Sequence, residues 1–255
     1  MSISANSLIS DSINFFKNQS SGLSTIIVLA TAVSTIIYAL MIPNAEMIAT
    51  FINTLVDAQT KFIDAGNDGM QSWIQDLPED NRSSIMRVSL GLLLSVTIGR
   101  LVLICGVLSY IARLSRGENI TAIQALTSSL PKAVSMFLLL IICSLLVQLG
   151  IAIMIVPGVI FAIGFSLAPA ILISENINVF SAIAKSWKLA YANWRFVFPI
   201  ILIWMATQML VGLLISNLNL NHIVGNGLSF LLNNVIAAFA LIYFYRLYML
   251  ISEKQ

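Results

Sequence analysis

Residues 133–174 read AVSMFLLLIICSLLVQLGIAIMIVPGVIFAIGFSLAPAILIS, and none of their side chains is charged. A straight helix of this length would extend about 63 Å, at about 1.5 Å per residue, whereas the hydrocarbon core of a bilayer is about 30 Å thick. The segment must therefore turn back, and Pro157-Gly158 is the strong helix breaker near its middle. We predict two membrane spans, at about 133–156 and 158–174, joined by almost no loop.

The composition of the whole chain also indicates a membrane protein. Of its 255 residues 58% are hydrophobic and only 9% are charged, whereas a soluble domain carries about 25% charged residues. This composition excludes a soluble globular enzyme, a disordered protein and a nucleic-acid-binding protein, which needs a basic surface. We therefore predict an all-α integral membrane protein with a single domain, residues 1–255, whose main partner is the phospholipid bilayer.

Four further apolar runs are long enough to cross a bilayer, which takes about 20 helical residues. They lie at about 22–42, 88–111, 196–215 and 227–245. Together with the two spans above they make six transmembrane helices, and residues 43–87 then form a long outer loop. In this loop Met47, Phe51 and Leu55 share one helical face, which predicts short surface helices rather than a folded domain.

The basic residues predict the orientation, because cytoplasmic loops carry an excess of lysine and arginine. An even number of spans places both termini on one side, together with the loops at 112–132 and 175–195. Nine basic residues lie on that side: Lys17, Arg113, Arg116, Lys132, Lys185, Lys188, Arg195, Arg246 and Lys254. Three lie on the other side: Lys61, Arg82 and Arg87. We predict that both termini are cytoplasmic.

Each pair of spans follows a segment with an amphipathic helical pattern. Segment 175–195 carries an apolar stripe formed by Phe180, Ile183, Trp187, Ala190 and Trp194. Segment 118–131 begins with Thr121 and Gln124 at the spacing of a capping box and is expected to end at Pro131. The N-terminal segment carries Ile9, Ile13 and Phe16. We predict three helical hairpins, each preceded by a cytoplasmic amphipathic helix.

Tryptophan and basic residues in and near these segments suit a membrane interface rich in anionic lipid headgroups. The candidate interface residues are Lys185, Trp187, Lys188, Trp194, Arg195 and Arg246. In the alternative interpretation, the amphipathic helices simply pack beneath the bundle of spans. Protein partners are not indicated by any motif.

Arg100 is the one charged residue near the centre of a predicted span. It lies 12 residues after Val88, and an arginine at such a depth costs at least about 2.5–3.5 kcal/mol. No predicted span contains a carboxylate, so the partners of Arg100 must be amides, carbonyls, water or an anion from outside, such as a lipid phosphate. The candidate intramembrane amides are Gln208, Gln148 and Asn233. Arg100 either lines a hydrated cavity that admits an anionic lipid or solute, or it snorkels or ties helices together through hydrogen bonds to amides.

Residues typical of catalysis or metal binding do not form a recognisable motif. There is no Ser/His/Asp constellation, no paired carboxylate within a span and no glycine-rich phosphate loop. Cys105 and Cys143 lie in apolar runs, and His222 has no second His or Cys near it, whereas zinc needs three or four ligands. We predict a protein without cofactor or metal that is not an enzyme.

Several segments resemble the YciC family of uncharacterised inner-membrane proteins of gamma-proteobacteria, over nearly the whole chain. They are Met1-Ser2-Ile3, Asn14–Gln19, Val156-Pro157-Gly158, Leu167–Ala170, Leu241–Tyr243 and Arg246–Ile251. Residues 44–90 and Arg100 depart from the family's pattern. The resemblance implies a multi-pass protein of the bacterial inner membrane, and it brings no established reaction.

A more distant likeness concerns the membrane domain attached to some glycerophosphodiester phosphodiesterases. It rests on the Pro157-Gly158 turn, Glu175 and the run from Ser181-Ala182-Ile183 through Ser186 to Leu189. Because the catalytic domain of those enzymes has no counterpart here, the likeness implies no phosphodiesterase activity.

Two functions remain open at this point. The first is a non-enzymatic role in lipid homeostasis of the membrane or envelope, exerted through the interfacial helices or through a lipid-binding cavity at Arg100. The alternative is a permease for a small anionic or neutral solute.

Overall fold

The structure is a computed structural model that describes residues 5–175, 177–218 and 220–253, without the side chains of residues 62, 64–72 and 74–75. Met1–Ile3 and Lys254, which were used above, lie outside the described residues. All ten elements of regular structure in the described chain are helices, and it contains no strand. Six of its segments are long and apolar enough to cross a membrane, in agreement with the predicted number: Ser20–Met41, Glu79–Leu114, Ala122–Ile153, Ile155–Ser174, Trp194–Ser216 and His222–Ser252.

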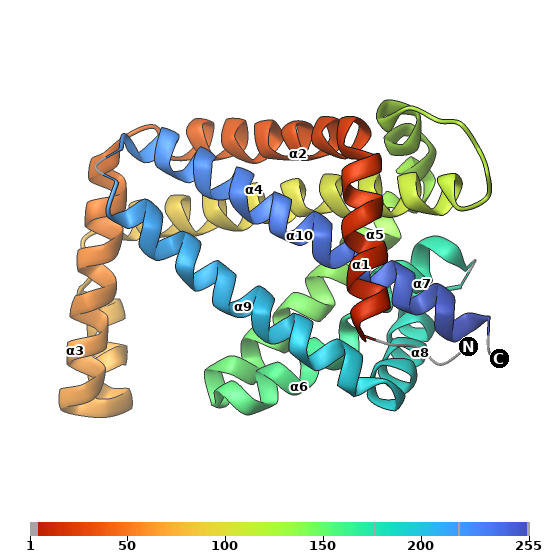
Figure 1. Ribbon diagram of the computed structural model, residues 1–255. Helices are drawn as coiled ribbons and strands as arrows, with labels where there is room; N and C mark the ends of the chain where they lie inside the picture. The colour runs from red at the N-terminus through yellow and green to blue at the C-terminus, as the bar shows by residue number, and fades with distance from the viewer. Residues whose placement is uncertain (1–4, 176, 219, 254–255) are drawn as a thin grey trace.

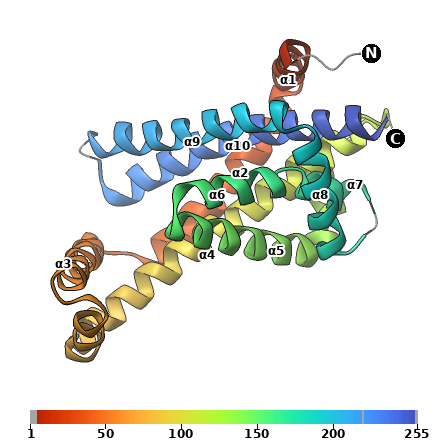
Figure 2. The ribbon, with the colours of Figure 1, turned by 90° about the horizontal axis from the view of Figure 1, so that it is seen from below.

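Ten helices make up the described part of the chain (Figure 1). They are α1 (Ala5–Asn18), α2 (Ser20–Met41), α3 (Ala45–Asp76), α4 (Glu79–Leu114), α5 (Ala122–Ile153), α6 (Ile155–Phe165), α7 (Ala168–Ser174), α8 (Val179–Ala192), α9 (Trp194–Ser216) and α10 (His222–Ser252). Helix α4 is central and packs against α2, α5 and α10. Helix α3 stands across one end of the bundle, and α1 and α8 lie near the other end with both termini (Figures 1 and 2).

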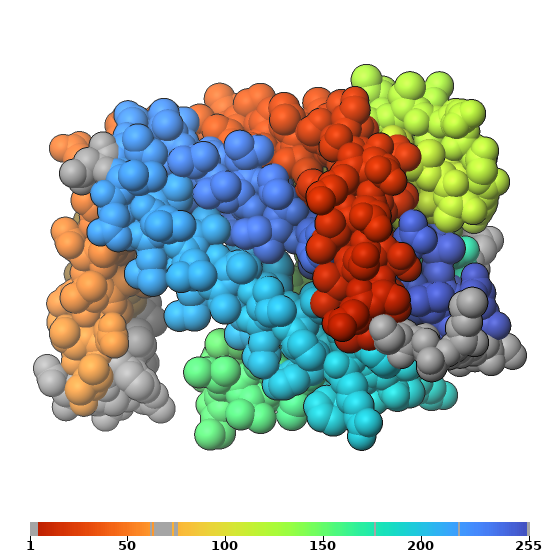
Figure 3. All heavy atoms as spheres, in the orientation of Figure 1, coloured from red at the N-terminus to blue at the C-terminus, as the bar shows by residue number. Residues whose placement is uncertain are grey.

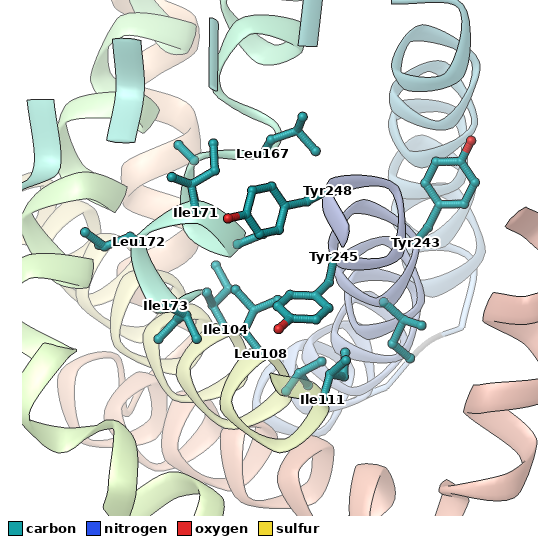
Figure 4. Packing of buried hydrophobic residues seen from close by; sticks show 14 of the residues in the cluster. Ile104, Leu108, Ile111, Leu167, Ile171, Leu172, Ile173, Tyr243, Tyr245 and Tyr248 are labelled. Atoms are coloured by element: carbon teal, nitrogen blue, oxygen red, sulfur yellow. The ribbon is translucent and has the colours of Figure 1, made fainter. Parts of the chain in front are cut away.

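The core lies where α4, α7 and α10 meet. Tyr245 and Tyr248 of α10 are buried between Ile104 and Leu108 of α4 and Ile171 of α7 (Figure 4). Tyr243, on another side of α10, donates a hydrogen bond to the backbone carbonyl of Phe196 in α9, at 2.9 Å. The buried ring faces supply the apolar contact and the hydroxyl groups satisfy polar atoms that water cannot reach.

The connection from α4 to α5 matches the sequence signals at both of its ends. Gly117 adopts φ +80°, a conformation that favours glycine, just after the end of α4. Arg113 forms an ion pair with Glu118 there, with 2.7 Å between Nε and Oε2. The predicted capping box is confirmed, because Thr121 and Gln124 exchange hydrogen bonds at the start of α5.

The prediction that a helix ends at Pro131 is wrong. Helix α5 continues through Pro131 to Ile153, so segment 118–131 and the following span are parts of one helix. One continuous face of α5 is buried on both sides of the proline, at Ala125, Ser129, Met136 and Leu139. Packing along this face keeps the helix together although Pro131 cannot donate a backbone hydrogen bond.

Two other boundaries differ from the sequence prediction. The chain reverses at Met154, three residues before the expected break, and Pro157 lies in the first turn of α6. A proline is tolerated there because the first amides of a helix have no partner within the helix. In the outer loop, one helix of 32 residues, α3, replaces the expected short helices, and α4 begins at Glu79 rather than Val88.

Candidate functional site

A cavity of about 360 Å³ lies between the α5–α6 pair on one side and α9 and α10 on the other, with α4 behind it. Most of its lining is apolar. The apolar side chains around its centre are Ile104, Leu140, Val147, Phe165, Trp204 and Phe244. The polar side chains at its wall are Arg100, Gln148, Ser144 and Ser166. The cavity therefore offers one positive charge within an apolar chamber.

Arg100 lines this cavity from the middle of α4 and is half-buried. Among the residues that the structure describes, none forms a hydrogen bond or an ion pair with its guanidinium group. This leaves five N–H donors of a permanently charged group without protein acceptors in a mainly apolar setting. The arrangement differs from the structural alternative, in which amide side chains hold Arg100 in place.

The three amides proposed as partners of Arg100 lie at different places. Gln148 lines the same cavity from α5. Gln208 and Asn233 do not line it, but each lies four residues, or one helical turn, from a lining residue, Trp204 and Ala237 respectively. The Gln208 Nε2 and Asn233 Oδ1 atoms are buried and have no hydrogen-bond partner in the described part of the chain.

Glu175 and Lys185 form an ion pair at the end of the bundle that holds the termini. The Lys185 Nζ atom lies 2.6 Å from Glu175 Oε1, and the Tyr248 hydroxyl donates to the same oxygen at 2.5 Å. Partial burial raises the pKa of the Glu175 carboxyl, but the hydrogen bonds from Lys185 and Tyr248 outweigh it, so the pKa lies below its usual value. Lys185 thus contacts a protein carboxylate, an interaction that the interface prediction did not foresee.

Trp187 is half-buried and packs against α6. A β-carbon added at Gly164 would lie 2.2 Å from the Trp187 ring, so the absence of a side chain at Gly164 makes room for the indole. The neighbouring Ser186 hydroxyl donates to the Gly164 carbonyl at 2.6 Å, and Tyr191 donates to the Ile160 carbonyl at 2.9 Å. These contacts fasten α8 to α6 and agree with the alternative in which this helix packs beneath the bundle.

The remaining candidate interface residues have different surroundings. Lys188, Trp194 and Arg195 are exposed, and half of the Trp194 surface is accessible. Arg246 lies over the ring of Phe15 in α1, with 5.2 Å from its guanidinium carbon to the ring centre. A role of these residues in binding lipid stays a prediction.

Lys132 has a role that the sequence interpretation missed. Its ammonium group donates to the backbone carbonyls of Leu172, Ile173 and Glu175 at 3.3, 2.9 and 3.3 Å. These carbonyls lie at the C-terminal end of α7, where the helix dipole favours a cation. In the sequence Lys132 is a single lysine that follows Pro131 at the start of an apolar run. This position does not reveal that the lysine contacts residues 40 positions further along the chain.

Comparison with known proteins finds relatives along the whole chain. Residues 1–250 match the family model described as "Uncharacterised protein family (UPF0259)". A UPF0259 membrane protein of Photorhabdus laumondii is 40% identical, over 100% of this chain and 98% of its own length. One of Serratia proteamaculans is 36% identical (99% and 100%), and one of Pectobacterium carotovorum is 31% identical (98% and 99%). No solved structure matches.

Proposed function

The chain belongs to the UPF0259 family of membrane proteins found across gamma-proteobacteria, and we propose that it binds an anionic lipid in the cavity at Arg100. This binding would serve lipid homeostasis of the membrane rather than a chemical reaction. We place the protein in the bacterial inner membrane with both termini in the cytoplasm, as the distribution of lysine and arginine suggests. In this orientation α3 is on the outer side.

The observation that carries the proposal is the guanidinium of Arg100, which lies in a mainly apolar cavity and has no partner among the described residues. A phosphate group is a strong acceptor for arginine, because guanidinium and phosphate can form two parallel hydrogen bonds. The apolar lining would accept part of an acyl chain next to it. A small hydrophilic anion would use Arg100 but would leave the apolar wall in contact with water, so an amphiphile fits better than the solute of a permease.

Replacing Arg100 with glutamine should weaken the binding of phosphatidylglycerol to the purified protein about tenfold or more. This follows because hydrogen bonds to charged groups contribute about 1.5–3 kcal/mol each and about 1.4 kcal/mol corresponds to tenfold. Native mass spectrometry of the detergent-solubilised protein, titrated with phosphatidylglycerol or with phosphatidylethanolamine, measures this. The Arg100→Lys variant should retain part of the preference for the anionic lipid.

Arg87→Gln is the matched control, because Arg87 also lies on α4 but is exposed. It should bind phosphatidylglycerol like the unaltered protein. Ser144→Phe, which places a ring at the cavity wall, should weaken binding without a change in charge. Equal binding by the Arg100→Gln and Arg87→Gln variants would refute the proposal. Competition by inorganic phosphate alone, with no effect of Ser144→Phe, would support the permease alternative instead.

A further inference from the structure

The turn between α5 and α6, residues 151–156, is apolar and unusually exposed. Helix α5 ends at Ile153 and α6 begins at Ile155, so Met154 alone connects them. Between 45% and 75% of the surface is accessible for each large side chain of the turn: Ile151, Ile153, Met154, Ile155 and Val156. No polar side chain occurs between Leu149 and Phe165. Turns that face water usually carry polar residues, and contiguous apolar patches on a surface indicate a contact with protein or lipid.

The turn does not extend as far as the neighbouring helix ends. In Figures 1 and 2 the α5–α6 turn stops short of the ends of α9 and α10 on the side of α3. Helix α6 has 11 residues before the chain bends at Ser166 and Leu167. At about 1.5 Å per residue, α6 alone covers about half of the hydrocarbon thickness.

The shortened pair leaves an open notch in the molecular surface. Figure 3 shows this notch beside α9 and α6. Several residues of α9 that are remote from the core expose their apolar side chains: Leu202, Ile203, Met209, Leu210, Leu213 and Leu214. Helix α9 borders the notch and is a candidate membrane span with exposed apolar side chains, which favours lipid acyl chains as the occupant of the notch.

The backbone of the turn is suited to an environment without water. The Met154 amide donates to the Gly150 carbonyl at 3.0 Å. Pro157 has no amide proton, so it removes one of the donors that the first turn of a helix leaves free. Polar backbone groups without partners are costly in hydrocarbon, and both features reduce their number.

We propose that the α5–α6 turn lies within the hydrocarbon of the leaflet on the α3 side, and that lipid acyl chains fill the notch next to it. In this arrangement α5 and α6 turn back before they reach the second surface, although each belongs to a segment that is long and apolar enough to cross a membrane. The Arg100 cavity, which is lined by α5, α6 and α9, then opens sideways toward this leaflet. The last statement rests on the proposed lipid binding, whereas the depth of the turn does not.

The depth can be measured with a fluorophore attached to single cysteines. In a Cys105→Ala/Cys143→Ala background, Met154→Cys is labelled with bimane and the protein is reconstituted into phosphatidylcholine vesicles. The vesicles contain lipids that carry a nitroxide either at the headgroup or near the end of the acyl chain. We expect the acyl-chain nitroxide to quench Met154→Cys at least about threefold more strongly than the headgroup nitroxide, as hydrocarbon burial requires.

Two matched positions calibrate this measurement. Ile203→Cys, on an exposed face in the middle of α9, should show the same preference for the acyl-chain nitroxide. Asn217→Cys, at the exposed end of α9 on the α3 side, should be quenched more strongly by the headgroup nitroxide than by the acyl-chain nitroxide. Ile153→Cys repeats the test at a second turn residue, and gel filtration verifies that each variant is monodisperse.

If Met154→Cys and Asn217→Cys had the same ratio of quenching by the two nitroxides, the proposal would be overturned, because the turn would then lie at the membrane surface. This outcome is distinct from a failure of the proposed function. Suppose that Arg100→Gln still binds phosphatidylglycerol normally while the acyl-chain nitroxide quenches the fluorophore at the turn. The proposed lipid binding at Arg100 is then refuted, and the proposed depth of the turn is supported.

Discussion

The Gly150→Val variant is expected to lose about 1–3 kcal/mol or more of stability, the range for overpacking a tight contact. A β-carbon at Gly150 would lie 2.8 Å from both the Cα and the N atom of Gly158. Since these are backbone atoms, no side-chain rotation can relieve the contact, and α5 and α6 have to move apart. We expect a lower thermal unfolding midpoint in detergent, measured by loss of the monodisperse gel-filtration peak on heating.

Gly212→Val is the control for the valine side chain itself. Among the described residues no atom of a neighbour lies within 4 Å of a β-carbon at Gly212, which is also in a candidate span. Valine has a higher helix propensity than glycine, so neither variant should lose stability from the helix itself. If both variants had the same unfolding midpoint as the unaltered protein, α5 and α6 would not make the close contact at Gly150.

The close pairing of α5 and α6 also illustrates what the sequence can reveal. The length of the uncharged run 133–174 requires a reversal, and this conclusion needs only the thickness of a bilayer. The position of the reversal was predicted three residues too late, because Pro157-Gly158 was interpreted as the turn itself. The two residues instead begin a helix: Pro157 lies where no donor is needed, and Gly158 allows α5 to approach.

Pro131 led to a second wrong boundary for a similar reason. A proline ends a helix when little else holds the helix together. In α5 the spacing of Ala125, Ser129, Met136 and Leu139 continues one buried face across the proline. That spacing is present in the sequence, so the continuous helix could have been predicted by following the apolar face instead of the breaker.

The candidate site was predictable only in part. Arg100 stood out because charge is rare within the spans, and the structure places it and Gln148 at one cavity. Neither the cavity nor the absence of a partner for Arg100 among the described residues could be inferred, since both depend on how α9 and α10 pack against the α5–α6 pair. Lys132 was overlooked because its acceptors are backbone carbonyls, which have no sequence signature.

Replacing Lys132 with methionine is therefore expected to destabilise the protein by about 3 kcal/mol, as hydrogen bonds to charged groups contribute about 1.5–3 kcal/mol each. Methionine keeps much of the length and the apolar part of the side chain, but it cannot donate to the carbonyls of Leu172, Ile173 and Glu175. These acceptors lie at the end of α7, so the loss should loosen the attachment of α7 to α5. The thermal unfolding midpoint in detergent should fall clearly.

Lys188→Met removes the same charge from an exposed position of α8 and serves as the comparison. It should unfold within about 0.5 kcal/mol of the unaltered protein, as most surface substitutions do. The difference between the two variants then measures the contacts of Lys132 and not the change in net charge. Equal stability of both variants would mean that water satisfies the carbonyls at the end of α7 as well as Lys132 does. A loss of stability in Lys132→Met alone would instead establish that this lysine joins α5 to α7. Both helices contribute residues to the lining of the Arg100 cavity.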